Sequence, residues 1–574
     1  MRIIFIDIET EGLDPFTDKL VLLQLMYNGG EIKLLDYTEV LKVKQLIETS
    51  LIVGHNLKFD LKFLKYQYGI NPKNVYDTET AEHVITGGLL VTKKNTTRLQ
   101  DLTNKYLGFS LKKDEQTSFK RGQELTPEQI QYAENDVKYL KTIYYAQQKL
   151  IQQMNLHQTI DIEMKVLPAV VNLELAGFYF NLEKSNAFAA VVNENRNRAK
   201  ELILHEFSKT TKTKQVTFNM SGETDSVFGG HLAPDINLNS SDQLIRVLGK
   251  LGLELESTGS SVLQDHLDVP VIQHLLAYRK AEKMLNTYIK KQKGYINPVT
   301  GRIHANFKQY GANTGRFSSS KPNLQNQPRT NEWRNLFTAP PGNKIITADY
   351  SQIELRILGE VAGDPEFIKA YMTGEDLHTK TASNIFNKPI SQVTKEERSV
   401  AKTINFGVIY GMGPKTLQSR LLEAGTVITR QEGMKYIKQF YASYPIISNY
   451  LQDIEKHGLQ ELCLRNRANR HLKLARPMSE IETYGIKNKC RNLPIQSLCA
   501  DILKTALASL DVKLETTGAR LVNTVHDELV FEAPAQDSKT IAETITQEMV
   551  KAGHQFLKTV PVEVDVSIGE CWSK

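Results

Sequence analysis

The chain has 574 residues and a mass of 65.0 kDa, which is too long for one hydrophobic core and predicts roughly four domains at about 150 residues each. Its 41% hydrophobic and 24% charged residues exclude a disordered or a fibrous protein. The 71 basic and 65 acidic residues give a net charge of only +6, so the total charge does not identify a polyanionic partner.

Cysteine usage and the N-terminus bear on where the protein works. Its four cysteines lie far apart and lack the C-x-x-C and histidine spacing of zinc sites, so we expect a reducing compartment, the cytosol, and no structural metal. The first residues, MRIIFIDIET, include two carboxylates and leave no room for a signal peptide. No segment approaches the roughly 18 consecutive apolar residues of a membrane span, so no membrane partner is expected.

The chain opens with an isoleucine-rich run from Arg2 to Ile8, whose length and β-branching predict a buried strand. A turn-like EGLDP follows, so an α/β domain begins at once. Alternate side chains of a strand share a face, which places the carboxylates of Asp7 and Glu9 on the same side near the end of the strand. Such a pair suits a hard divalent cation.

Further acidic residues belong to helical patterns of the same domain. Asp60 opens an apolar helical pattern in GHNLKFDLKFL, and Asp77 precedes a threonine in YDTE, as a helix cap does. A later TPEQ combines an N-cap, a first-turn proline and a capping-box glutamine. In the helix that TPEQ starts, Tyr132 and Asp136 stand four residues apart and share a face. Three segments could therefore converge, in a first domain that we close near residue 155.

The middle of the chain is predicted to be mostly helical from about 186 to 290, with a polar interruption between Thr210 and Ser241. The segment from Tyr278 to Phe337 holds 12 Lys and Arg against 2 Asp and Glu, so its charge of +10 exceeds that of the whole chain. A local excess of this kind is the electrostatic footprint of a nucleic-acid-binding surface.

The C-terminal half contains three further patterns. KIITADYSQIELRIL is strand-like, residues from about 362 to 480 are largely helical, and RLVNTVHDELVFEAP alternates as a pair of strands. Asp349 ends the first strand, and Asp527 lies at the tip of the final pair. Neither aspartate alone identifies a function.

Between these aspartates, four residues recur at intervals of four within RSVAKTINFGVIYG: Arg398, Lys402, Phe406 and Tyr410. On a helix they form one stripe that is cationic at its start and aromatic toward its end. The basic half could be a solvated face and the aromatic half core packing. A cationic helix start is also what a triphosphate requires, with the aromatic end stacking on base and sugar.

The order of the N-terminal acidic motifs is more specific than each motif alone. D-I-E-T, H-N-x-x-F-D and Y-A-E-N-D, in this order, resemble the motifs of proofreading 3′–5′ exonucleases. The resemblance implies that two divalent ions are held by Asp7, Glu9, Asp60 and Asp136, and that Tyr132 orients the attacking water. Two ions about 4 Å apart supply a nucleophilic hydroxide and stabilise the leaving 3′ oxygen. Asp77 resembles a supporting acidic residue of that family or is simply a helix cap.

DYSQIELR, R-x-x-x-K-x-x-x-N-F-G-x-x-Y-G and V-H-D-E resemble the three core motifs of family A DNA polymerases, the group of bacterial DNA polymerase I. T-G-R-F-S-S with PNLQN resembles the part of that family that grips the primer–template. With the exonuclease motifs, the resemblance spans nearly the whole chain. It implies an α/β and α+β multidomain protein: a ribonuclease-H-like exonuclease domain followed by a right-hand polymerase.

The resemblance also implies domain boundaries. The exonuclease covers 1–155 and the polymerase 156–574, with the thumb at about 186–290, fingers at about 362–480 and palm at about 160–185, 291–361 and 481–574. Because the chain begins almost at the first exonuclease strand, we expect no 5′-nuclease domain and no nick translation.

Residue roles in synthesis follow from the same resemblance. Asp349 and Asp527 would bind two Mg²⁺ ions, with Glu528 as an auxiliary carboxylate. Lys402 would also donate a proton to pyrophosphate, and Glu354 would crowd the place of a ribose 2′-hydroxyl. The nucleotide-binding residues would be Arg398, Lys402, Phe406, Tyr410, His378, Gln352 and Glu354. The residues that contact the duplex or primer end would be Arg316, Asn323, Gln325, Asn492, Gln496 and His526.

The sequence departs from the family pattern in two places. Asn488 stands where many relatives carry an arginine, and Ser497-Leu498-Cys499 replaces the usual small residues after Gln496. Lys487, Lys489 and Arg491 are candidate cations in place of the missing arginine.

We therefore predict template-directed DNA synthesis from dNTPs with 3′–5′ proofreading. The partners would be primer–template DNA, dNTPs and single-stranded 3′ ends, and the enzyme would be a monomer. Each active site would use two Mg²⁺ ions, with Mn²⁺ as a substitute, in a bacterial cytosol or in a host cytosol if the source is viral. The alternatives are a single-subunit RNA polymerase-like enzyme and a catalytically decayed DNA-binding accessory protein. Glu354 and the exonuclease motifs oppose the first alternative, and the intact Asp349, Lys402 and Asp527 oppose the second.

Overall fold

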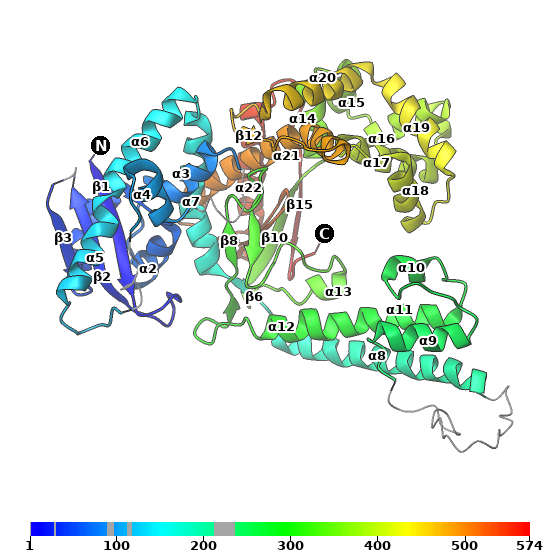
Figure 1. The fold of residues 1–574 in the computed structure, drawn as a ribbon, viewed down its shortest axis with the longest axis horizontal. Coiled ribbons are helices and arrows are strands. Elements are labelled where there is room, and N and C mark those ends of the chain that lie inside the picture. The colour runs from blue at the N-terminus through cyan, green and yellow to red at the C-terminus, as the bar shows by residue number, and fades with distance from the viewer. Residues whose placement is uncertain (1, 28–29, 89–96, 112–117, 212–235, 574) are drawn as a thin grey trace. The chain divides into compact units, whose positions relative to one another are not determined.

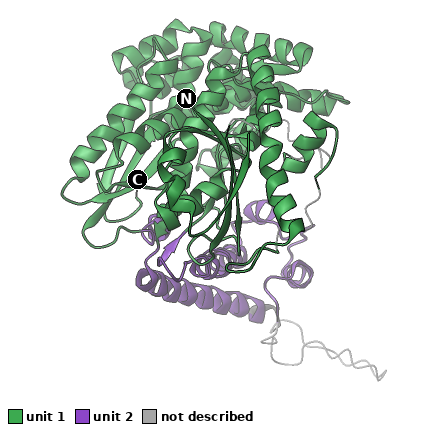
Figure 2. Cartoon of the chain, turned by 90° about the vertical axis from the view of Figure 1, so that its left-hand side faces the viewer, with its two compact units in different colours: residues 1–179, 304–329, 338–574 green, residues 180–303, 330–337 purple. Residues whose placement is uncertain are grey.

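The computed structural model describes residues 2–27, 30–88, 97–111, 118–211 and 236–573 (Figure 1). The chain divides into two compact units, with residues 1–179, 304–329 and 338–574 in the first and residues 180–303 and 330–337 in the second (Figure 2). Of the polar stretch predicted between Thr210 and Ser241, residues 212–235 lie outside the described residues.

The N-terminal part of the first unit is built on a five-stranded sheet with the order β3-β2-β1-β4-β5. Strand β1 pairs antiparallel with β2 and parallel with β4, and its prediction as a buried strand is confirmed. Ile4, Ile6 and Ile8 of β1 pack in one apolar layer, and Phe5 packs in the layer on the other face. Asp7 and Glu9 therefore share the face of Phe5. The strands are β1 (Ile3–Thr10), β2 (Leu20–Tyr27), β3 (Ile32–Asp36), β4 (Leu51–Gly54) and β5 (Val75–Asp77).

Helices cover both faces of this sheet. One apolar layer includes α2 and α7, and the other includes α3, α4 and α6. The predicted capping box at Thr126 is confirmed, because its side chain accepts from the backbone N–H of Gln129 while the Gln129 side chain accepts from that of Thr126. The helices are η1 (Val40–Val43), α1 (Lys44–Glu48), α2 (Lys58–Tyr68), α3 (Thr78–Ile85), α4 (Leu99–Leu107), α5 (Pro127–Lys138), α6 (Leu140–Gln153) and α7 (His157–Ala176).

The rest of the first unit contains a four-stranded antiparallel sheet with the order β13-β14-β10-β15. The final pair of strands was predicted correctly. The strand predicted for KIITADYSQIELRIL is wrong beyond Tyr350, because Gln352 adopts a left-handed backbone (φ 51°) and a helix starts at Ile353. The strands are β10 (Asn343–Tyr350), β13 (Arg520–Val525), β14 (Glu528–Pro534) and β15 (Val564–Gly569).

Helices between β10 and β13 account for most of the remaining first unit, as the sequence predicted for residues 362–480. They are α14 (Ile353–Ala362), α15 (Pro365–Thr373), α16 (Leu377–Phe386), η3 (Ile390–Gln392), α17 (Lys395–Ile409), α18 (Pro414–Glu423), α19 (Arg430–Ser443), α20 (Pro445–Glu461) and α21 (Glu480–Lys513). Helix α22 (Ser538–Phe556) follows β14. The short strands are β6 (Phe178–Tyr179), β8 (Asn306–Lys308), β9 (Ser318–Ser320) and the hairpin β11 (Cys463–Arg465) and β12 (His471–Lys473).

The second unit is helical around a small core that includes Ile203, Phe207, Leu244 and Leu275. Its long helices α8 and α11 pack against each other. The basic stretch KKQK at residues 290–293 forms α12, in which Lys290 and Lys291 are exposed and Gln292 is buried. The elements are α8 (Leu182–Thr211), α9 (Ser241–Lys250), α10 (Ser260–Gln264), α11 (Pro270–Lys283), the π-helix η2 (Met284–Ile289), α12 (Lys290–Lys293), α13 (Asn331–Arg334) and β7 (Arg302–Ile303).

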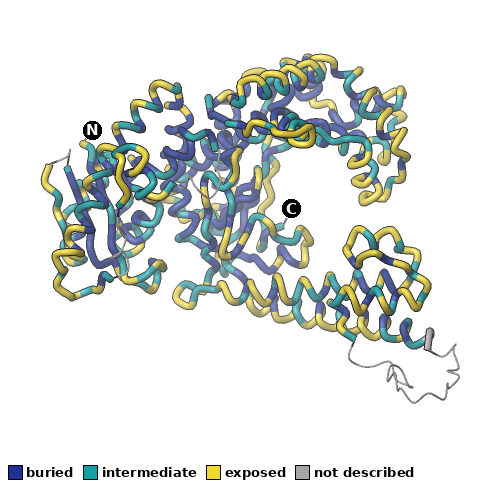
Figure 3. The backbone as a smooth tube through the Cα atoms, viewed as in Figure 1, coloured by how far each residue is buried: buried dark blue, intermediate teal, exposed yellow. Residues whose placement is uncertain are grey.

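Burial separates the sheet cores from the surface (Figure 3). The central strands β1, β2, β10 and β14 are buried along most of their length, whereas β15 is mostly exposed. None of the helices that the structure describes is both long and apolar enough to cross a membrane.

Candidate active sites

Three carboxylates converge where α5 packs beside β1. Asp7 and Glu9 come from the strand and Asp136 from the helix, and one carboxylate oxygen of each lies within 4.8 Å of the others. Glu9 and Asp136 are buried, and Gln24 Nε2 donates a 3.2 Å hydrogen bond to Glu9 Oε1. Three of the four predicted metal ligands are thus within reach of a single cation.

The fourth predicted ligand, Asp60, lies outside this group of three but interacts with it electrostatically. It is buried in the first turn of α2, and its Oδ1 atom has no hydrogen-bond partner among the described residues. Burial, and then the charge of Asp7, raise the pKa of Asp60 well above its usual value. A divalent cation would offset both burial and repulsion, so this donor set fits a divalent metal.

Tyr132 and Asp77 lie near these carboxylates. Tyr132 is one turn before Asp136 on α5, and burial together with the charge of Asp136 raises the pKa of its hydroxyl. Asp77 caps α3 by accepting from the N–H groups of Glu79 and Thr80, and the Thr80 hydroxyl donates to it over 2.6 Å. The cap predicted for Asp77 is confirmed.

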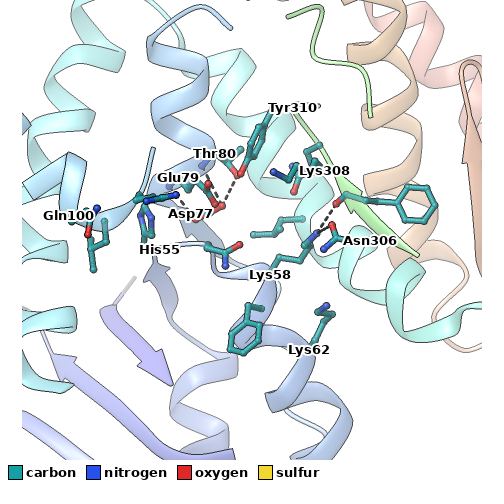
Figure 4. Close-up of a pocket in the computed structure, with 17 residues that line it drawn as sticks. His55, Lys58, Lys62, Asp77, Glu79, Thr80, Gln100, Asn306, Lys308 and Tyr310 are labelled. Carbon is teal, nitrogen blue, oxygen red and sulfur yellow. Dashed lines mark hydrogen bonds between the residues drawn. The ribbon is translucent and has the colours of Figure 1, made fainter. Parts of the chain in front are cut away.

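A cavity of about 640 Å³ lies between α2, α3 and β8 within the first unit (Figure 4). Lys58, Lys62 and Lys308 line it, together with the carboxylates of Asp77 and Glu79. No motif in the sequence assigned a role to these lysines. Lys58 could have been found, because it stands two residues before Asp60 within the quoted motif.

The second acidic site lies at the end of β10. Asp349 is paired in register with Glu528 of β14, and the N–H of Tyr350 donates to the backbone oxygen of Asp527 over 3.3 Å. Glu528 is buried and accepts a 2.6 Å hydrogen bond from the indole nitrogen of Trp572. The three predicted carboxylates are therefore neighbours, and two aspartates beside a third carboxylate are oxygen donors of the kind that a divalent cation requires.

Backbone strain accompanies this site. His526, directly before Asp527, has a φ of 58°, and Gln352, three residues after Asp349, has a φ of 51°. Non-glycine residues in the left-handed region cost free energy and cluster at functional sites. The side-chain oxygen of Gln352 accepts from the Tyr371 hydroxyl over 3.3 Å.

The predicted stripe lies on α17, which begins with a capping box at Thr394. Arg398 and Lys402 are exposed on this helix, and Phe406 is half-buried, so the basic face is open to solvent. The helix ends at Ile409, and Tyr410 is its C-terminal cap rather than a member of its last turn.

Arg398 and His378 are held by neighbours of α17. The guanidinium of Arg398 pairs with Asp376, the N-cap of α16. His378 lies in the first turn of α16, with Nδ1 2.9 Å from the amide nitrogen of Asn405, and burial lowers its pKa to about 4. Its ring centroid is 5.7 Å from that of Phe406. Asp376 was not predicted, although an aspartate before Leu-His-Thr is a recognisable cap signal.

Glu354 joins the end of α17 to the basic segment. Its carboxylate accepts from the Tyr410 hydroxyl over 2.6 Å and pairs with the guanidinium of Arg316. The side chain of Gln496 also hydrogen-bonds to Tyr410. Four residues predicted to serve the nucleotide and the primer end therefore form one network, which links α14, α17, α21 and the loop before β9.

Two family models match the parts of the chain that carry the two groups of carboxylates. A family model described as DNA polymerase family A matches residues 204–574, and a model described as 3′–5′ exonuclease matches residues 1–152. The DNA polymerase I of Aquifex aeolicus is 32% identical over an alignment that covers 100% of this chain and 96% of the relative. The chain belongs to DNA polymerase family A. It carries a 3′–5′ exonuclease domain before its polymerase domain, and the predicted fold class and activity are confirmed.

Other relatives of this family A polymerase align over different shares of their length. The DNA polymerase I of Pseudomonas aeruginosa is 30% identical over 100% of this chain and 64% of the relative. The thermostable DNA polymerase I of Thermus aquaticus is 36% identical over 58% of this chain and 42% of the relative. A solved structure, the polymerase domain of Pol1 from M. smegmatis in complex with DNA primer–template and dNTP, has the same fold. Its TM-score is 0.81 at 24% identity, covering 99% of this chain and 95% of that chain.

The residues predicted to contact DNA in this polymerase differ in exposure. Asn323 is exposed, and its Oδ1 accepts from the N–H groups of Gln325 and Asn326, while Gln325 Nε2 donates to the backbone oxygen of Thr524 over 3.1 Å. His526 is exposed. In the part of the chain that the structure describes, Asn492 Oδ1 is buried without a hydrogen-bond partner.

The residues at which the sequence departs from the family pattern lie on α21. A side chain added at Gly411, which has a φ of 63°, would meet Asn488 Oδ1 at 2.0 Å, so Asn488 lies against the turn that follows α17. Arg491 pairs with Glu455 and donates to Tyr441 Oη over 3.0 Å. Of the three candidate cations, Arg491 is therefore already engaged within the polymerase.

Trp572 is a site neighbour that sequence reasoning missed. It lies just beyond β15, is buried, and donates to Glu528. Nothing in the local pattern GECW indicates that its indole reaches a carboxylate more than 40 residues earlier, because that contact depends on the pairing of β10 with both β14 and β15.

Proposed function

We propose that the protein extends a primer 3′-hydroxyl on a DNA template from dNTPs and edits single-stranded 3′ ends in its N-terminal domain. The synthesis proposal is supported above all by the register of Asp349 with Glu528, which places both residues beside Asp527. Glu354, which follows the same strand β10 in the chain, contacts Tyr410 at the end of α17. DNA primer–template and dNTP are the ligands named for the M. smegmatis structure. The chain would act as a monomer in the cytosol, where these substrates are found.

Divalent metal use is general in both families, and we propose Mg²⁺ at both sites, with Mn²⁺ as a substitute. When bound, two such ions activate the attacking oxygen and stabilise the leaving oxygen. Asp349 and Asp527 would hold them for synthesis, with Glu528 oriented by Trp572 as an auxiliary carboxylate. Asp7, Glu9, Asp60 and Asp136 would hold them for editing, and Tyr132 would orient the attacking water.

The exposed basic face of α17 supports the assignment of the triphosphate. Arg398, already oriented by Asp376, and Lys402 would bind the phosphates near the start of the helix, where the backbone dipole also favours an anion. Lys402 would donate the proton to pyrophosphate. His378 would add a phosphate contact, and its lowered pKa keeps it neutral at pH 7.

We also propose the domain boundaries that the sequence suggested. The exonuclease would cover 1–155, and the palm would include β10, β13, β14 and β15. The fingers would be about 362–480, and the thumb would be about 186–290, a segment that lies within the second compact unit. The duplex or primer end would contact Arg316, Asn323, Gln325, Asn492, Gln496 and His526.

A primer-extension assay tests this function. With dNTPs and Mg²⁺ we expect template-directed extension, with none in a chelator and little with NTPs. Preferential use of NTPs would indicate an RNA polymerase, and DNA binding without extension would indicate a decayed accessory protein. Removal of a mismatched 3′ nucleotide before extension tests the editing activity in the same reaction.

Phe406→Tyr is expected to raise the use of dideoxynucleotides relative to dNTPs. The phenyl ring offers no hydroxyl, so the 3′-hydroxyl of the nucleotide must complete the polar contacts near the phosphates, and a dideoxynucleotide lacks it. A tyrosine would supply that hydroxyl. If one or two hydrogen bonds are gained, the use of dideoxynucleotides relative to dNTPs should rise roughly 10- to 1000-fold. Competition between the two nucleotide types measures the ratio, and an unchanged ratio would contradict the placement of Phe406.

Glu354→Ala is expected to admit ribonucleotides, because its carboxylate is proposed to fill the 2′ position. The same change removes the partner of Tyr410 and Arg316, so we also expect dNTP incorporation to fall modestly. Glu354→Gln is the matched control, since it keeps the shape and should keep the rejection of NTPs. Competition of NTPs against dNTPs measures both effects. Continued rejection of NTPs by Glu354→Ala would remove this residue from the sugar site.

A further inference from the structure

Four charged side chains from three elements meet in the interior of the first unit. Glu163 comes from α7, Arg470 from the β11–β12 loop, and Asp501 and Lys504 from α21, and their exposed fractions are 0%, 5%, 0% and 0%. Arg470 Nη2 is 2.6 Å from Glu163 Oε1, Arg470 Nε is 3.0 Å from Asp501 Oδ1, and Lys504 Nζ is 2.5 Å from Glu163 Oε1. Two cations and two anions make the cluster formally neutral.

Two amide side chains complete the polar contacts of this cluster. Gln309 Nε2 donates to Glu163 Oε2 over 3.0 Å and to its backbone oxygen over 2.9 Å. Asn466 Nδ2 donates to Asp501 Oδ2 over 2.7 Å and to Ser497 Oγ over 3.0 Å. Burying four charges costs desolvation that ion pairing only partly offsets, so stability is a weak explanation of the cluster. The fixed geometry of the four side chains explains the cluster better than a contribution to stability does.

The two cations touch the two residues that flank Arg316. Gly315 has a φ of 76°, and a Cβ atom there would lie 2.9 Å from Arg470 Cζ, so the backbone passes directly over the guanidinium. On the other side, Lys504 Nζ is 5.5 Å from the centroid of the Phe317 ring, within the range of a cation–π contact. Arg316 itself pairs with Glu354 rather than with a member of the cluster.

We propose that the buried cluster Glu163–Arg470–Asp501–Lys504 positions Arg316 for DNA synthesis. The cluster holds the backbone at Gly315 and the ring of Phe317, so the guanidinium of Arg316 is presented to Glu354 and the primer end in one orientation. Arg470 and Lys504 act through Arg316 and are positioning residues. The inference rests on the proposed function of Arg316.

Arg470→Lys tests this inference, because it keeps the charge and removes the planar fork that spans Glu163 and Asp501. We expect the rate of single-nucleotide extension at saturating DNA and dNTP to fall roughly 10- to 100-fold, as a displacement of about 1 Å in a positioned group does. We expect the exonuclease rate on single-stranded DNA to stay unchanged. In an Arg316→Ala background, Arg470→Lys should cause no further loss, a result that general structural damage would not give.

Arg467→Lys is the matched control, because Arg467 lies in the same loop but pairs with Glu360, away from the cluster. Its extension rate should equal that of the wild type. If Arg470→Lys fails to fold, judged by thermal unfolding and the exonuclease rate, Phe317→Leu carries the test. That change keeps all four charges, removes the ring beside Lys504, and should show the same dependence on Arg316 with a smaller effect.

The outcomes separate the inference from the proposed function. The positioning role would be overturned if the double variant lost extension rate by the product of the losses in Arg470→Lys and Arg316→Ala. It would also be overturned if Arg470→Lys extended the primer as fast as Arg467→Lys. If Arg316→Ala itself leaves extension unchanged, the proposed role of Arg316 is wrong and the inference falls with it.

Discussion

Replacing Asp7 and Glu9 together by alanine is expected to abolish degradation of a DNA 3′ end while most primer extension remains. The two side chains supply two of the three carboxylates that lie within 4.8 Å of one another, and the carboxylates assigned to synthesis belong to the other sheet. Losing about 4 kcal/mol of metal-dependent transition-state stabilisation corresponds to a rate roughly 10³-fold lower. Release of nucleotides from a labelled single strand measures this rate.

The control for this variant is Asp36→Ala with Glu39→Ala. These residues have the same side-chain types and belong to the same domain, and they bond to Thr38 and Lys42 rather than to a member of the carboxylate cluster. The control changes the net charge equally and should keep both activities. A folded Asp7/Glu9 variant that lost primer extension as well would show that the two sites are not separable.

Asp349→Asn is expected to have the opposite effect, with extension lost and the exonuclease retained. The change keeps the size of the side chain in β10 but removes the negative charge beside Asp527 and Glu528. If Asp349 is a metal ligand, extension should fall by roughly 10³-fold or more, again the equivalent of about 4 kcal/mol. Single-turnover extension of a matched primer is the measurement, and raising the Mg²⁺ concentration should restore little of the rate.

Asp565→Asn distinguishes the loss of a ligand from the loss of local charge. Asp565 lies directly opposite Asp349 on the other neighbouring strand, β15, and is exposed. Its replacement removes one negative charge from the same region without touching a proposed ligand, so extension should stay close to the wild-type rate. Near-normal extension by Asp349→Asn would contradict the proposed synthesis site.

Local patterns in the sequence were sufficient to predict which faces of its elements carry the chemistry. Alternation along β1 puts Asp7 and Glu9 on one side, and the capping box at Thr126 starts the helix that carries Asp136. These features depend on residues within about one turn or one strand of each other, so they can be inferred without knowing what the element packs against. The family motifs are also short stretches of sequence, so the candidate residues of both sites could be named from them without knowing how the chain packs.

Only the tertiary structure decided which of these faces meet. The strand prediction failed beyond Tyr350 because an apolar run can form either a strand or a helix, and here the backbone turns at Gln352. The pairing of Glu354 with Arg316 and Tyr410 joins residues 38 and 56 positions apart. The contact between Arg470 and Gly315 spans a still longer stretch of chain. Such contacts follow from strand register and helix packing between distant segments, which no local periodicity encodes.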